Sequence, residues 1–91
     1  MRLVRVTWVD IHSYDEPWMD LKEAQSMKPV EMDTVGWIAE ESEEHIVIFS
    51  TQSTEGDSVG SINAIPKGVI KNVVSLHHVT LDSSMQPNEG R

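Results

Sequence analysis

The sequence predicts a small, mainly β domain, in which five short strands bend into an SH3/Sm-like barrel with one short helix after the first strand. Three observations predict this class. The chain has 91 residues, which is enough for one domain. Several short segments alternate apolar and polar residues, the period of a half-buried strand. A tight turn at residues 66–68 comes directly before the last such segment, where these barrels place a single helical turn.

The expected strands are short apolar or alternating stretches: residues 3–12, 34–41, 45–52, 59–65 and 69–76. In the first, the apolar parity changes after Trp8, which either a bulge or a fully covered strand end explains. In the second, Gly36 stands between large residues and indicates a close backbone approach or a sharp bend. The third is apolar on both faces and is therefore expected at the centre of the sheet. The domain as a whole is expected to cover residues 1–81.

A helix is expected at residues 17–27. Pro17 suits its first turn, and Pro29 ends it at or before Lys28. Apolar residues at a spacing of three share one of its faces: Trp18, Leu21 and Ala24. A helix this short is not stable alone in water, so we expect it to pack on the sheet and cover one open end of the barrel.

The C-terminal residues raise two expectations. Residues 82–91 are polar and contain Pro87 and Gly90, so they are predicted to form a disordered tail. The last strand carries apolar residues of both parities, which predicts that another subunit or the segment around Val79 and Leu81 covers it. The first alternative makes the protein a homo-oligomer.

Charge restricts the partners. The net charge is -8, and 11 of the 15 acidic residues lie between Asp10 and Glu44. Such a surface repels phosphate backbones, which argues against direct nucleic-acid binding. The acidic half of the chain forms either a solvated face or a binding surface for a basic partner. In the second case, the protein can act as a mimic of nucleic acid. The absence of cysteine and of a long apolar run predicts a cytoplasmic protein that does not enter a membrane.

No motif predicts an enzyme or a cofactor. A nucleophile elbow and a glycine-rich phosphate loop are both missing. Asp10 and His12 share a strand face, and His77 and His78 lie near the other end of the chain. Adjacent histidines in a strand point to opposite faces, so these four residues do not predict a metal site.

Three tryptophans form a large share of the apolar volume: Trp8, Trp18 and Trp37. Each stands at a position consistent with one face of its element, which favours a place in the core. The alternative is partial exposure at a binding surface, where aromatic side chains supply rigid contact area.

Segments spread over residues 4–76 resemble a group of small uncharacterised proteins of tailed bacteriophages and prophages. They are residues 6–11 with Trp18, residues 28–30, residues 34–38, residues 45–48 and residues 65–70. The group has no assigned activity to carry over. The resemblance implies an accessory protein made in the infected bacterial cytoplasm, where such proteins commonly inhibit a host protein or sequester a defence signal.

Three functions follow as hypotheses. The first is a protein–protein inhibitor that binds a host protein through an acidic face formed by Glu40, Glu41, Glu43 and Glu44. The second is an oligomeric sponge that holds a nucleotide-like signal between subunits. In that case Trp8 or Trp37 stacks on a base, and the phosphate meets three groups: Arg5, Lys67 and the amide of Gly68. The third is a minor structural phage component.

Overall fold

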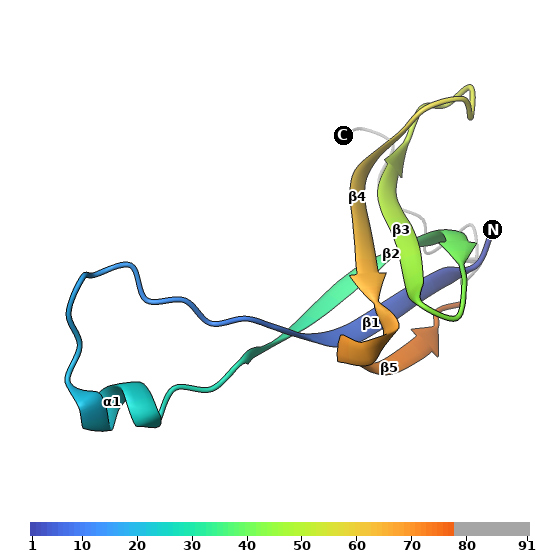
Figure 1. Cartoon of the computed structure of the whole chain (residues 1–91). Coiled ribbons are helices and arrows are strands. Elements are labelled where there is room, and N and C mark those ends of the chain that lie inside the picture. Colours follow the sequence, from blue (N-terminus) through green and yellow to red (C-terminus); the bar gives the residue numbers. More distant parts are fainter. Residues whose placement is uncertain (78–91) are drawn as a thin grey trace, which may run out of the picture.

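The computed structural model describes residues 1–77, and these form a mainly β structure with one short helix (Figure 1). Five strands make one antiparallel sheet in the order β4-β3-β2-β1-β5. Their bounds are β1 (Leu3–Asp10), β2 (Val30–Glu41), β3 (His45–Gln52), β4 (Val59–Pro66) and β5 (Ile70–Ser75). The prediction of five strands is confirmed. The predictions for the tail at 82–91, for Val79 and Leu81 and for His78 lie outside the described residues.

The main core cluster lies on one face of this sheet, while Phe49, which is 1% exposed, is buried on the other face. Directly opposed residues of antiparallel strands share a face, and Val4 and Val6 on β1 therefore face the same side as Gly36 and Thr34 on β2. The fully buried residues on this side are Val4, Val6, Ile46, Ile48 and Ile65. The 3-10 turn η1 (Lys67–Val69) connects β4 to β5 and adds Val69 to this core. The prediction of a helical turn before the last strand is thus confirmed.

Gly36 marks the close backbone approach that the sequence predicts. A Cβ placed on this residue would lie 2.6 Å from the backbone oxygen of Phe49, well inside van der Waals contact. Beside it, the Ser50 hydroxyl donates a hydrogen bond to the Val35 carbonyl across the β2–β3 pair at 2.6 Å. Only glycine leaves room for the two strands to come this close.

Two expectations about the strands are corrected by the topology. The central strand is β2 and not β3, because β2 pairs with both β1 and β3 in the middle of the five. Its pairing with β1 continues to the end of that strand, where Asp10 opposes Val30, so β2 begins four residues earlier than expected. The β1–β5 register shifts between Thr7 and Trp8, which places a bulge or irregularity, one of the two expected alternatives, next to the change of apolar parity.

The helix differs most from its prediction. The expected helix at 17–27 is reduced to α1 (Leu21–Gln25), which buries no residue. It does not cover the sheet, because the paired β1 and β2 carry their connection away from the core (Figure 1). Trp18 is 87% exposed, so its expected place in the core is wrong. We call residues 11–29 the arm.

The sheet has two edges, β4 and β5, and no hydrogen-bonded pairing joins them in the described residues. The closed barrel is therefore not shown, although η1 contacts both β1 and β3. Within residues 1–77, no helix has the length and apolar character needed to cross a membrane.

Candidate functional site

Hydrogen bonds of Ser42 hold the turn between β2 and β3. The Ser42 hydroxyl accepts hydrogen bonds from the backbone N–H groups of Glu44 and His45, at 3.1 and 3.2 Å. The Ser42 backbone N–H donates to the His45 carbonyl at 3.0 Å. These bonds fix the backbone between the strands, so the side chains of Glu43 and Glu44 leave the sheet at defined points and are both exposed. We use the name acidic turn for residues 40–44.

One of the four predicted carboxylates is already engaged. The Lys67 ammonium binds the Glu41 carboxylate at 2.9 Å, and this hydrogen bond and charge hold the pKa of Glu41 below its usual value. The Lys67 backbone N–H also donates to the Glu44 carbonyl at 2.7 Å. Lys67 therefore ties η1 to the acidic turn. Among the predicted acids, Glu40, Glu43 and Glu44 are exposed and form no ion pair in residues 1–77.

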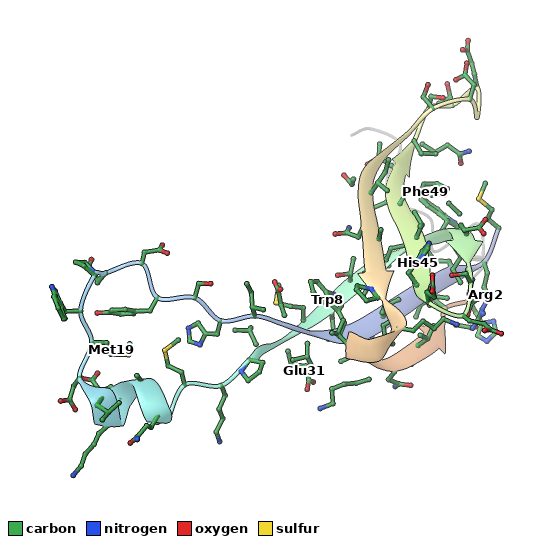
Figure 2. All side chains as sticks on the ribbon, in the orientation of Figure 1. Arg2, Trp8, Met19, Glu31, His45 and Phe49 are labelled. Atoms are coloured by element: carbon green, nitrogen blue, oxygen red, sulfur yellow. The ribbon has the colours of Figure 1, made fainter. Side chains whose placement is uncertain are left out.

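The neighbourhood of the acidic turn contains a further positive charge. Arg2 lies close enough to contribute to the lowered pKa of Glu41, and its Nε donates to the Ser75 hydroxyl at 2.8 Å. Figure 2 shows Arg2 and His45 at this end of the sheet, whereas Met19 lies at the far end of the molecule in the arm. The acidic turn and the arm are thus two separate projections from one sheet.

The two tryptophans proposed to stack on a base lie on opposite faces. Trp8 opposes Met32 in the register, while Trp37 opposes Leu3, an odd number of residues away along both strands. Trp8 packs against the core, and its indole N–H donates to the Thr34 hydroxyl at 2.9 Å. Trp37 stacks at a tilt on Phe49, with 5.7 Å between ring centroids. One chain cannot bring both rings to one ligand.

The proposed phosphate contacts are also dispersed. Lys67 is occupied by Glu41, and Gly68 is exposed at η1, with no atom within 4 Å of where its Cβ would be. Arg5 lies in the middle of β1 on the face opposite the core, between Val35 and Val74 in the register. It shares that face with Trp37 but not with Trp8.

The described residues contain neither a pocket nor a cluster of three metal-ligating side chains. Comparison with protein-family models, with curated proteins and with solved structures found no match to this chain. In the described residues, the candidate binding surfaces are therefore exposed groups of side chains.

Two surfaces were not predicted from the sequence as binding sites. The first is the arm, where Ile11, Trp18 and Leu21 are exposed. The second is an apolar row on the face opposite the core, which we call the outer face. There the register aligns one residue from each of four strands, which we call the outer stripe: Leu3, Trp37, Phe49 and Ile62. The double-sided apolarity of residues 46–49 was its visible signal.

Proposed function

We propose that this protein is a non-enzymatic binding protein that captures a basic surface of a host protein through its acidic turn. The observation that supports the proposal is the rigid presentation of Glu40, Glu43 and Glu44 at one end of the sheet. Their carboxylates are available to lysine and arginine of a partner, and the backbone that carries them is already ordered. Binding then costs little additional conformational entropy in this turn.

Lys67 acts in this proposal as a positioning residue. By pairing with Glu41 and bonding the Glu44 carbonyl, it holds the turn against η1. The side chains of Glu40, Glu43 and Glu44 are then exposed and form no ion pair within residues 1–77, because the Lys67 ammonium is bound to Glu41. Such exposed charges accelerate association and select partners by sign, and their effect decreases with ionic strength.

The biological setting belongs to the same proposal. The protein acts in the cytoplasm of an infected bacterium, as an accessory protein of a phage, in host takeover or in blocking a defence. Its scaffold is a small SH3/Sm-like barrel, for which the strand order and the η1 turn between β4 and β5 are the support. The resemblance over residues 4–76 supports the phage origin.

The test is a capture experiment with a matched control. The tagged chain is used to capture proteins from infected bacterial lysate at low and at high salt, and bound proteins are quantified by mass spectrometry. The test variant carries Glu43→Lys and Glu44→Lys. The control variant carries Glu55→Lys and Asp57→Lys, which change the charge equally in the β3–β4 connection. Circular dichroism checks that both variants keep the sheet.

We expect a host protein that binds at low salt, dissociates at high salt and is lost from the test variant at least tenfold more than from the control. Equal retention by the two variants would overturn the acidic turn as the binding surface. Retention that does not depend on salt would also count against it, since a contact made by exposed carboxylates is screened within about 8 Å at physiological ionic strength.

A further inference from the structure

The arm is paired at its base, and beyond it no residue of the arm joins the core formed by the described residues 1–77. The His12 Nδ1 atom lies 3.1 Å from the Lys28 carbonyl oxygen, which continues the β1–β2 pairing beyond Asp10 and Val30. Beyond this point Ile11 is 80% exposed and Leu21 is 70% exposed. A five-residue helix without a packed face is unstable in water. The arm therefore requires another apolar surface to cover it.

The outer face offers such a surface. Ile62 is 57% exposed and Val35 is 46% exposed, and both lie beside the ring pair of Trp37 and Phe49 in the register. The outer stripe crosses four strands and thus forms a continuous apolar band. Phe49 itself is 1% exposed, so Ile62 and Val35 supply the exposed part of this band, and exposed apolar patches on a small domain mark interaction sites.

The charges of the two surfaces match at one position. The arm carries four acids, Asp15, Glu16, Asp20 and Glu23, against two lysines. Arg5 is exposed on the outer face, and it forms no ion pair within residues 1–77. Asp33 stands on the same face and accepts a hydrogen bond from the Thr7 hydroxyl, so the match between two copies is confined to an arm carboxylate and Arg5.

We propose that the arm of one chain binds the outer face of a second copy, with Trp18 on the outer stripe and the arm carboxylates beside Arg5. The arm leaves the sheet along the direction of β1 and β2, away from its own outer stripe (Figure 1). The eight residues from Ile11 to Trp18 span up to about 26 Å, enough to reach across a neighbouring sheet. A two-fold axis lets each chain give one arm and receive the other.

The area is sufficient for a stable dimer. Tyr14 and Trp18 are both exposed, and an aromatic side chain buries about 150–250 Å². Because Trp18 is 87% exposed and Tyr14 only 49%, the four side chains of a dimer have roughly 400–700 Å² left to bury, and the surfaces that receive them contribute a comparable amount. The total is close to the roughly 1,000 Å² expected of a specific interface. This inference concerns self-association and is independent of the acidic turn.

The first test measures mass by light scattering at micromolar concentration on the full chain. We expect a dimer for the native sequence and at least a tenfold weaker dimer for Trp18→Asp and for Ile62→Asp. Val59→Asp is the control, because Val59 is similarly exposed but lies at the end of β4, outside the outer stripe. Mixing the Trp18→Asp and Ile62→Asp chains restores one intact arm-to-face contact and should recover part of the dimer.

The second test uses the absence of native cysteine. Chains carrying Leu21→Cys are mixed with chains carrying Ile62→Cys under mild oxidation, and we expect a cross-linked dimer containing one of each. A native chain that is monomeric at all concentrations would overturn the proposal. So would a dimer that Trp18→Asp and Ile62→Asp leave unchanged. A double-cysteine chain that closes within itself at high dilution and fails to cross-link between chains would show that the arm folds back on its own sheet.

Discussion

In the sheet, Ile48 is 0% exposed and touches the other core residues, whereas in the arm Trp18 is 87% exposed and touches none of them. Both side chains are large and apolar, and both stand at positions that periodicity assigns to a packed face. The difference comes from pairing. Ile48 lies on a strand with hydrogen-bonded neighbours on both sides, while Trp18 lies beyond the last pair of β1 and β2.

The two regions also differ in how they satisfy polar groups. The sheet anchors its turns with side chains, as Ser42 does in the acidic turn, and pairs Lys67 with Glu41 and Lys71 with Glu31. In the described residues, no ion pair involves an arm residue. Among residues 1–77, the ion pairs thus belong to the sheet, and the large apolar side chains of the arm stay exposed.

The largest expected effect separates the two regions by stability. Ile48→Ala removes a fully buried side chain from the core and should lower the free energy of unfolding by about 2–5 kcal/mol. Leu21→Ala in the arm is the matched truncation and should change it by less than about 0.5 kcal/mol in dilute, monomeric protein. Urea denaturation of both variants measures the difference. Equal losses would mean that the arm is part of the core.

The next effect concerns the close approach of the strands at Gly36. Gly36→Ala places a methyl group against the Phe49 carbonyl, so the β2–β3 pair must move apart, at a cost of about 1–3 kcal/mol. Gly68→Ala is the control, because its Cβ meets no atom within 4 Å. Thermal unfolding of the two variants should show a clearly lower Tm for Gly36→Ala alone. A similar Tm for both would contradict the close approach of the strands.

The sheet could be predicted from the sequence better than the arm could. The strands and the turn at 66–68 were predictable because alternation, glycine and proline act locally. The role of Gly36 was predictable for the same reason. The position of α1 could not be predicted from the sequence. The pattern of Trp18, Leu21 and Ala24 indicates that a helix has an apolar face, but it does not indicate what covers that face. That depends on where β1 and β2 stop pairing.

The candidate site was partly predictable for a related reason. The acidic turn is a local cluster, and the sequence showed it directly. The ion pair of Glu41 with Lys67 joins residues far apart in the chain and needed the sheet to bring η1 beside β2. The placement of Trp8 and Trp37 on opposite faces likewise depends on the register of β1 and β2. Alternation shows which residues of one strand share a face, but only the pairing shows which residues of the next strand lie on that same face.

A smaller effect is expected at the acidic turn. Ser42→Ala removes the acceptor for the Glu44 and His45 backbone N–H groups and should cost about 1 kcal/mol, since water replaces part of the lost bonding. Ser13→Ala in the arm is the matched change, because Ser13 makes no hydrogen bond among the described residues. Chemical denaturation should detect the first and not the second. Faster amide exchange at Glu44 and His45 in Ser42→Ala would locate the effect.

The smallest effect is electrostatic and concerns how the sheet holds its charges. Lys67 lowers the pKa of Glu41, first through its hydrogen bond and then through its charge. A carboxyl whose pKa is lower in the folded state stabilises the fold above its unfolded pKa, and this stabilisation is lost as the pH falls through the lowered value.

Lys67→Met should therefore raise the pKa of Glu41 toward its ordinary range, which carbon-detected NMR titration of the side-chain carboxyl measures. Lys71→Met, which removes the partner of Glu31, is the control and should leave Glu41 unchanged. An unchanged pKa in Lys67→Met would mean that the ion pair does not persist in solution, and that the acidic turn presents a fourth available carboxylate.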